Sequence, residues 1–267
     1  MGVPLDRAIG ESTYGGKAVN LAVALRAGLP VPSGFALSTE AVDSIVAGDP
    51  DAVSLLHDAF ARLDGPVAVR SSAIGEDSLS ASFAGQYTTR LNVGQRSDLV
   101  DAVREVWESG RSEAAVQYRQ DRGLTGSAAM GVVIQKLVVP DTAGVLFTRN
   151  PVTGADERVI EACWGLGEAV VLGLVTPDLY RVSRQGEVLE RTPGRKDRMV
   201  QPRAEGGTGE VAVASDRVHA LCLDDGQLME LHDLASRCET ITGTARDIEW
   251  AFAQGARFLL QHRAVTG

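Results

Sequence analysis

The sequence contains few of the residues that mark metal-binding, redox or membrane proteins. Its 267 residues include three cysteines, four histidines and 5 % aromatic residues. Cys163, Cys222 and Cys238 are widely spaced and form no CxxC pair, so no zinc knuckle or redox motif is present. A sparse, odd set of cysteines fits a reducing cytoplasm, and we expect each thiol to act as a small buried hydrophobe.

Long hydrophobic runs and an excess of positive charge are also missing. No run reaches the length of a membrane span, and the N-terminal segment lacks the apolar core of a signal peptide. The net charge is -9, whereas a nucleic-acid-binding surface is normally basic. We therefore expect a cytoplasmic protein without nucleic-acid or membrane partners, in which a local basic pocket can still bind a polyanion.

The most informative pattern is DIEWAFAQGARFLLQHR, near the end of the sequence. With the two-residue period of a strand, Asp247 and Glu249 lie on one face, and so do Gln261 and Arg263. Two strands joined at the central Gln-Gly turn would bring these groups together. Carboxylates hold Mg²⁺, and the guanidinium fork suits a phosphate. The pattern favours a nucleotide-triphosphate site, although a buried acid paired with an arginine would satisfy the same spacing.

A second pattern, YGGKAVNLAVALRAGLPVP, predicts a helix over residues 17–27 that ends at a glycine before two prolines. Lys17 falls in the first turn, where backbone amides are unpaired and the helix dipole is positive. A cation is unfavourable there unless an anion binds at the same place. The alternative is a lysine that simply extends into solvent.

A third pattern is a short buried strand, VAVR over residues 67–70, followed by SSAIGEDSLSASFAGQY. We expect this run of small residues to be a loop whose backbone amides approach phosphate oxygens. Arg70 at its entrance is placed to clamp a phosphate. A plain surface linker is the alternative.

Helices and strands are expected to be mixed along the rest of the chain. Gln135 and Lys136 interrupt an apolar strand over residues 129–139, which is costly unless both are satisfied, and a hinge there could read an adenine edge. Residues 192–210 are basic and then glycine-rich, so we expect a mobile surface segment. Further helices are predicted over 52–63, 98–110, 112–121 and 224–242, and further strands over 88–93, 143–148, 159–162, 179–183 and 188–191.

Seven segments, in the same order, resemble the nucleotide-binding domain of the pyruvate phosphate dikinase and phosphoenolpyruvate synthase family, which rifampicin phosphotransferases share. They are GGKAVNLAVALRAGLPVPSGFAL, VAVRSSAIGEDSLSASFAGQY, VVIQKLV, GVLFTRNPVTG, EACWGLGEAVVLGLVTPDLY, GRKDRM, and DIEWAF with LLQHR. The resemblance implies an α+β, ATP-grasp fold of two lobes with Mg-ATP between them. The implied lobes are residues 1–136, with the phosphate loop, and 137–267, with the metal and catalytic residues.

The resemblance also implies roles for individual residues. Lys17 and Arg70 would contact the ATP phosphates, and Arg263 would stabilise charge on the phosphoryl group in flight; all three are candidate catalytic residues. Glu249, Gln261 and Asp247 would hold Mg²⁺. The remaining nucleotide contacts implied are Gly85, Gln86 and Thr88 near the phosphates, Gln135, Lys136 and Leu137 at the adenine, and Glu161 near the ribose, with Gln261 also near the nucleotide.

The resemblance further implies a partner, because the family's ATP domain passes a phosphoryl or pyrophosphoryl group to a histidine on a separate swivelling domain. That domain then carries the group to an unknown small-molecule acceptor. The family's TxGGxxxH type of motif is missing from this sequence. By alternation His262 lies on the strand face opposite Gln261 and Arg263, so we interpret it as structural. The histidine would therefore be supplied by another domain or protein.

Two other functions fit the same sequence. A stand-alone ATP-grasp kinase or ligase would act directly on a small molecule, since one fold supports both chemistries. A nucleotide sensor would bind ATP without turnover, but the acids at 247 and 249 and the arginine at 263 argue against an inactive site. The sequence also departs from the family near its start, where only a short helix separates GFALSTEA from VAVRSS and family members carry a longer insert.

Overall fold

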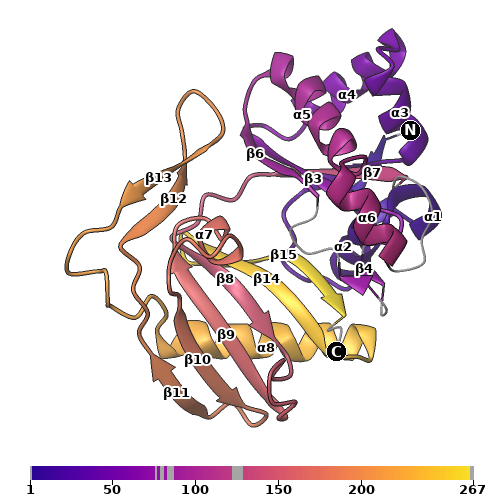
Figure 1. Cartoon of the computed structure of the whole chain (residues 1–267). Helices are drawn as coiled ribbons and strands as arrows, with labels where there is room; N and C mark the ends of the chain where they lie inside the picture. The colour runs from indigo at the N-terminus through magenta and orange to yellow at the C-terminus, as the bar shows by residue number, and fades with distance from the viewer. Residues whose placement is uncertain (1, 76, 79–80, 83–86, 122–128, 265–267) are drawn as a thin grey trace. The chain divides into compact units, whose positions relative to one another are not determined.

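The computed structural model describes residues 2–75, 77–78, 81–82, 87–121 and 129–264 (Figure 1). The chain forms two compact units, and both draw on more than one segment. The first comprises Met1–Arg26, Pro32–Leu137 and Arg203–Gly207, and the second comprises Ala27–Val31, Val138–Pro202 and Thr208–Gly267. Each unit combines helices with a mixed-length antiparallel sheet, which confirms the predicted α+β class.

The first unit is built on a five-stranded antiparallel sheet of order β1-β2-β7-β3-β6. Helices α3, α4 and α5 pack on one face, where Val69 of β3 and Ile134 of β7 lie opposite each other in the core. The strands are β1 (Gly2–Pro4), β2 (Gly34–Leu37), β3 (Val67–Ala73), β6 (Thr89–Val93) and β7 (Met130–Lys136); the helices are α3 (Thr39–Val46), α4 (Pro50–Ala61), α5 (Arg96–Ser109) and α6 (Glu113–Asp121). A further pair, β4 (Asp77–Ser78) and β5 (Ala81–Ser82), forms its own ladder.

The other face of this sheet receives α1 (Glu11–Tyr14) and α2 (Gly16–Arg26), which follow a short 3-10 helix at Leu5–Arg7. Ser72 Oγ on β3 accepts a hydrogen bond of 2.9 Å from Ala18 N in the first turn of α2. The approach is close enough to require glycine, because a Cβ on Gly15 would lie 1.7 Å from Ser72 O and a Cβ on Gly131 would lie 2.4 Å from Tyr14 O. Gly15 also has a φ of +79°, which L side chains rarely adopt.

The second unit is built on a six-stranded antiparallel sheet of order β11-β10-β9-β8-β14-β15. Figure 1 shows α8 lying across one face of it. Trp250 is fully buried on that face and lies opposite Gly144, which leaves room for the indole ring. The elements are β8 (Thr142–Phe147), β9 (Glu157–Trp164), α7 (Glu168–Val171), β10 (Asp178–Ser183), β11 (Val188–Thr192), α8 (Asp225–Thr242), β14 (Arg246–Ala253) and β15 (Ala256–Ala264).

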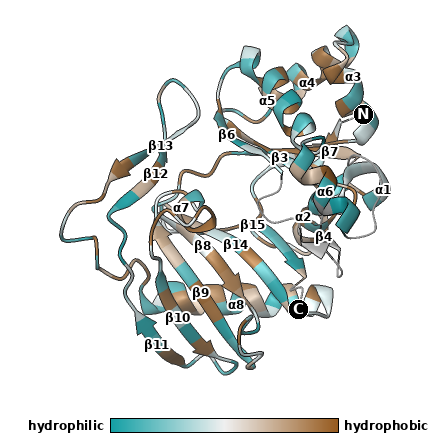
Figure 2. Cartoon of the chain, viewed as in Figure 1, coloured by the Kyte–Doolittle hydropathy of each residue, from teal (hydrophilic) through white to brown (hydrophobic). Residues whose placement is uncertain are grey.

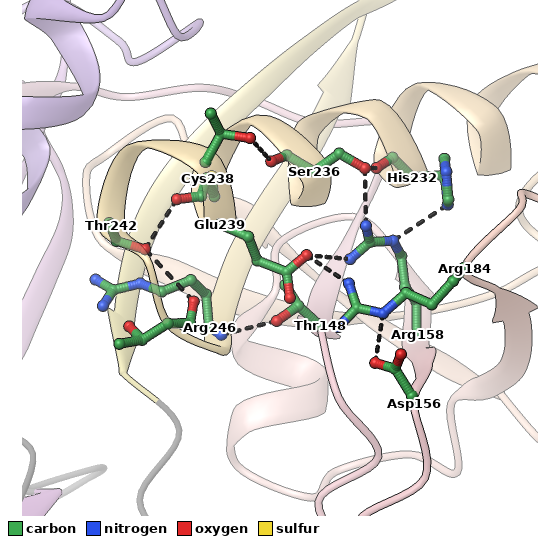
Figure 3. A network of polar contacts seen from close by, with 12 residues as sticks. Thr148, Asp156, Arg158, Arg184, His232, Ser236, Cys238, Glu239, Thr242 and Arg246 are labelled. Atoms are coloured by element: carbon green, nitrogen blue, oxygen red, sulfur yellow. Dashed lines mark hydrogen bonds and ion pairs between the residues drawn. The ribbon is translucent and has the colours of Figure 1, made fainter.

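Helix α8 has strong local signals at both ends. Asp224 and Gln227 form a capping box, in which each side chain accepts a hydrogen bond from the other residue's backbone N–H. Gly243 ends the helix in the left-handed conformation and donates to Glu239 O at 2.7 Å. Between these caps the helix contributes polar side chains to a charged network on the sheet (Figure 3).

Residues 192–210 differ from the expected surface segment. They contain β12 (Arg198–Pro202) and most of a hairpin with β13 (Thr208–Ala212). Lys196 is fully buried and forms an ion pair with the equally buried Asp178. Asp178 also accepts from the backbone amides of Gly194 at 2.7 Å and Cys222 at 2.8 Å. Most residues of the segment are at least partly exposed, as expected, but Lys196 is not. A buried lysine with a carboxylate partner has the same local composition as an exposed basic loop, so the sequence does not distinguish them.

One strand boundary and one helix differ from the sequence predictions. Strand β3 continues to Ala73, so the first three residues of the expected phosphate loop belong to a fully buried strand. Helix α3, for which no helix was predicted, begins at Thr39 and is capped by Ser38 Oγ, which accepts from Ala41 N. All three cysteines are buried, as predicted. Within the described residues, no helix combines the length and the apolar character that crossing a bilayer requires.

Gly144→Ala should destabilise the second unit. A Cβ at this position would lie 1.9 Å from Glu161 O and 2.9 Å from Trp250 Cζ2, and backbone cannot move aside cheaply. We expect a loss of about 3 kcal/mol, or roughly 6–12 °C in Tm, measured by thermal unfolding. Gly167→Ala is the matched control, because its Cβ would meet only Ala143 Cβ at 3.7 Å. Equal Tm values for the two variants would contradict the packing argument.

His232→Gln should reduce the loss of stability in mild acid. Burial, and then the charges of Arg158 and Arg184, lower the pKa of His232, while Asp233 and Glu239 partly oppose this. Arg158 Nε donates to His232 Nδ1 at 3.1 Å, which requires that nitrogen to be unprotonated. Since the unfolded histidine binds a proton at higher pH than the folded one, stability falls as pH drops through about 6.5.

The measurement is the difference in Tm between about pH 7.5 and pH 5.5, a window above the titration of most carboxylates. The His232→Gln variant should show the smaller difference. His219→Gln is the control, because His219 is exposed and its pH response should match that of the wild type. An unchanged response in His232→Gln would show that the histidine does not titrate between the folded and unfolded states.

Candidate functional site

The predicted closing hairpin is confirmed, and its register determines which side chains share a face. Strands β14 and β15 pair Asp247 with Arg263 and Glu249 with Gln261. Directly opposed residues in an antiparallel pair lie on the same face. Figure 2 shows hydrophilic colour toward the end of β15, where two of these residues lie. The four groups predicted from the sequence therefore form two adjacent cross-strand pairs.

His262 lies on the opposite face, as predicted. It pairs with Ile248 in the ladder, is buried, and its Nδ1 lies 2.7 Å from Arg246 Nη2. This arrangement supports the interpretation of His262 as a structural residue, because its ring is enclosed and engaged with an arginine.

Arg263 and Asp247 form an ion pair. Arg263 Nε and Nη2 donate to Asp247 Oδ2 at 2.8 and 2.6 Å. Both side chains are largely buried, so each holds the other in one orientation. The alternative raised by the spacing, an acid paired with an arginine, is therefore present in the structure.

The pKa of Asp247 lies above its usual value. Burial is the main cause, Arg263 opposes it, and the nearby charge of Glu249 adds to it. The raised pKa therefore reflects mainly the loss of water around this carboxylate, which the contact with Arg263 only partly offsets.

Glu161 lies on the same face of the sheet. Val145 of β8 pairs with Glu249 on one side and with Glu161 of β9 on the other, so the three residues form one row. Two strand spacings separate the acids by roughly 10 Å. Burial raises the pKa of Glu161. The roles expected of Glu161, near the ribose, and of Glu249, at the metal, remain predictions.

The donor set fits Mg²⁺ better than a metal held entirely by protein. Among the residues that the structure describes, no group of three or more histidine, cysteine, aspartate or glutamate side chains could hold a metal. Asp247 and Glu249 supply two carboxylates, and Gln261 supplies an amide beside them. Mg²⁺ commonly uses one or two carboxylates and fills its octahedron with water and substrate phosphates.

In the first unit, Lys17 and Arg70 are both buried. Lys17 lies in the first turn of α2 with 5 % of its surface exposed, which excludes the alternative of a lysine extending into solvent. Arg70 lies on β3, on the same face as Ser72, which accepts from the first turn of α2. Helix and strand therefore place cationic groups at the positive end of a helix dipole.

Of the three residues expected near the phosphates after β3, the structure describes only Thr88. Gly85 and Gln86 lie outside the described residues. Thr88 is exposed, and its backbone N–H donates to Ser109 Oγ at the end of α5, at 3.1 Å. Thr89, rather than Thr88, pairs with Arg70 in the ladder.

The expected adenine hinge is already engaged within the first unit. Gln135 Nε2 donates to Pro32 O at 3.1 Å. The backbone amides of Lys136 and Leu137 donate to Ser33 O at 2.8 Å and Pro66 O at 3.0 Å. A base at this strand end would therefore depend on carbonyl groups or on the exposed Lys136 side chain rather than on these amide donors.

The sequence analysis missed the buried group around Asp178. Lys196, the hydroxyl of Tyr180 and two backbone amides surround this carboxylate. Burial raises the pKa of the neighbouring Cys163 to about 12, so this thiol is not a reactive nucleophile. The sequence offered a weak signal for this pair, namely an acid in PDLY and a lysine in GRKD that each lie beside apolar or turn residues. Nothing in the sequence indicates that the two residues are partners.

Comparisons with known proteins all indicate the same family. Residues 50–267 match the family described as pyruvate phosphate dikinase, AMP/ATP-binding domain. The chain is 34 % identical to a probable phosphoenolpyruvate synthase of Methanothermobacter thermautotrophicus, over 94 % of this chain and 44 % of the relative. It is 36 % identical to a rifampicin phosphotransferase of Streptomyces sp, over 97 % and 35 %. It is also 36 % identical to the prodigiosin synthesizing transferase PigC of Serratia marcescens, over 98 % and 32 %.

The chain thus spans less than half the length of these relatives. Among solved structures, it is similar to D-alanine–D-alanine ligase from Bacillus anthracis, with a TM-score of 0.46 and 9 % identity over 93 % of this chain and 56 % of the ligase. At these values the structural likeness adds nothing to the family assignment, which rests on the sequence matches. The chain belongs to the pyruvate phosphate dikinase AMP/ATP-binding domain family.

Proposed function

We propose that this chain binds Mg-ATP and passes a phosphoryl or pyrophosphoryl group to a histidine on a separate carrier domain or protein. The observation that carries the proposal is the register of β14 and β15, which gathers two carboxylates, an amide and a guanidinium on one sheet face. Family membership supports ATP as the nucleotide. The carrier would then deliver the group to a small-molecule acceptor whose identity depends on other parts of the enzyme.

We assign distinct roles in the proposed reaction to individual residues. Lys17 and Arg70 neutralise phosphate oxygens, and Glu249, Gln261 and Asp247 hold Mg²⁺. The bound ion supplies further neutralisation of phosphate charge. Arg263, which Asp247 holds in one orientation, donates to the transferring group. Such charge neutralisation and positioning account for most of the catalysis of phosphoryl transfer.

The transfer step is a displacement at phosphorus. An imidazole nitrogen of the carrier attacks the β-phosphorus and forms a P–N bond while the bond to the α-phosphate oxygen breaks and AMP leaves. Attack at the γ-phosphorus would release ADP instead. The product therefore distinguishes pyrophosphoryl transfer from phosphoryl transfer. ADP formed without any histidine carrier would indicate the alternative, a stand-alone kinase or ligase.

Arg263→Ala should retain ATP binding and lose transfer. The guanidinium acts mainly on charge that develops in the transition state, so we expect the rate to fall by about 10³-fold or more. The measurement is chromatographic detection of AMP and ADP with the carrier domain of a relative, such as the probable phosphoenolpyruvate synthase. Arg195→Gln is the matched control, because this arginine is 70 % exposed. Transfer at the wild-type rate by Arg263→Ala would refute the catalytic role.

Glu249→Gln should weaken the Mg²⁺-dependent part of ATP binding, and Lys17→Ala should weaken binding as a whole. Loss of one interaction with a charged partner is worth about 1.5–3 kcal/mol, or roughly 10- to 100-fold in Kd. Calorimetric titration with ATP, with and without Mg²⁺, measures both effects. Binding without turnover in the presence of a carrier would favour a nucleotide sensor, and identical Kd values for wild type and both variants would place ATP elsewhere.

A further inference from the structure

The second unit contains a pocket of about 320 Å³ that the proposed reaction does not use. It is lined by Arg149, Asp156, Arg184, Glu239 and the backbone after α8 at residues 243–245. Arg158, which contacts Glu239 beside this pocket, lies on the α8 face of the sheet. The closing hairpin presents Asp247 and Arg263 on the opposite face. The pocket is therefore separate from the candidate ATP groups.

Both acids of the pocket already have cationic partners. Glu239 Oε2 accepts from Arg184 at 2.6 Å and from Arg158 at 3.2 Å, and Asp156 Oδ1 accepts from Arg184 Nε at 2.6 Å (Figure 3). The arginines lower the pKa of Glu239 even though burial raises it. Both carboxylates are already engaged by arginines, so they do not offer a site for a cation.

Positive charge exceeds negative charge around the pocket. Arg149 is exposed and makes no hydrogen bond or ion pair with any other residue in the described part of the chain. Arg246, next in sequence to the lining residue Ala245, is buried beneath α8. Arg246 contacts His262 rather than the pocket. Arg149, Arg158 and Arg184 thus give three guanidinium groups against the two carboxylates, Asp156 and Glu239. A local cationic excess in a chain of net charge -9 indicates an anion.

The loop that carries Arg149 is held in one conformation. Asn150 Oδ1 accepts from Val152 N and Thr153 N at 3.0 Å each, and Asn150 Nδ2 donates to Glu157 Oε1 at 2.7 Å. Gly154 N donates to Asn150 O at 2.9 Å. These bonds fix the TRNPVTG segment, a motif that the proposed reaction leaves without a role. Binding at Arg149 then costs little loop ordering.

The end of α8 opposes an anion only weakly. Its C-terminal dipole is negative, but Gly243 N donates to Glu239 O at 2.7 Å and Thr242 Oγ1 donates to Cys238 O at 2.9 Å. The first of these bonds satisfies one of the last carbonyls of the helix. Direct donation from guanidinium groups to an anion is stronger than the residual dipole.

We propose that this pocket binds a small phosphate-bearing anion, held by Arg149 and by the Nη2 edge of Arg184. Arg184 uses Nε and Nη1 on the two carboxylates, which orients its fork toward the pocket. The volume lies at the small end of ligand sites, so it admits inorganic phosphate or a phosphate monoester with a few carbons. The site is additional to the proposed ATP site.

The test is calorimetric titration of the full chain with inorganic phosphate, methyl phosphate and acetate. The titrations are done with and without a saturating non-hydrolysable ATP analogue and Mg²⁺. We expect saturable phosphate binding that persists with the analogue and weakens at least about tenfold in Arg149→Gln, the loss of one charge-assisted contact. Arg195→Gln, the exposed control, should bind as the wild type does. Tighter binding of methyl phosphate identifies a monoester as the occupant, and equal or tighter binding of inorganic phosphate identifies the free ion.

Three results would overturn the site: no saturable binding of either phosphate, the same affinity in Arg149→Gln, or complete displacement by the ATP analogue. Acetate binding as tight as phosphate would overturn the ligand class. If the analogue itself fails to bind, the proposed ATP function fails, while Arg149-dependent phosphate binding would still support this pocket. The two proposals are therefore tested separately by the same titrations.

Discussion

The pairing of β14 with both β8 and β15 is the constraint on which the candidate site depends. It aligns Glu161, Glu249 and Gln261 across the sheet, through Val145, and places Asp247 beside Arg263. The same pairing turns Ile248 and Trp250 toward the core. A slip of one residue would bury the site residues under α8 and expose the core residues, so the hydrophobic requirement of one face determines the chemistry of the other.

The sequence predicts the part of the candidate site that depends on residues close together in the chain. Period-two alternation and one turn suffice to place Asp247, Glu249, Gln261 and Arg263, and the structure has that hairpin. Pairings between distant segments were not accessible in the same way. From the sequence, Lys196 is predicted to belong to a basic surface segment. Only the structure shows that it pairs with Asp178, which lies on β10. Likewise, the sequence shows Arg149 only as one residue of a turn. The structure shows that α8 and the β10–β11 turn form a pocket beside it.

The helices and strands also divide into those that local signals predict and those that depend on distant partners. Caps, glycines and periodicity predict α2, α5 and α8 to within a few residues, because these signals act within one or two turns. Strand β3 extends three residues beyond its prediction because its serines are enclosed by other elements. Ser72 accepts from α2, and Gly15 and Gly131 allow the backbones to approach. Small polar residues predict a loop only where no partner satisfies them.

Alternation along β14 and β15 also gives the two faces of the sheet different electrostatic characters. Arg246 and His262 contact each other on the α8 side, and their sequence neighbours Asp247 and Arg263 contact each other on the opposite side. Asp247 and Glu249 lie on the second face, where we propose that Mg²⁺ and a nucleotide bind. Arg158 and Arg184 lie with Glu239 on the first, beside the pocket where we propose that an anion binds. Because each strand contributes consecutive residues to both faces, one hairpin places the Asp247–Arg263 pair on one face and the Arg246–His262 pair on the other.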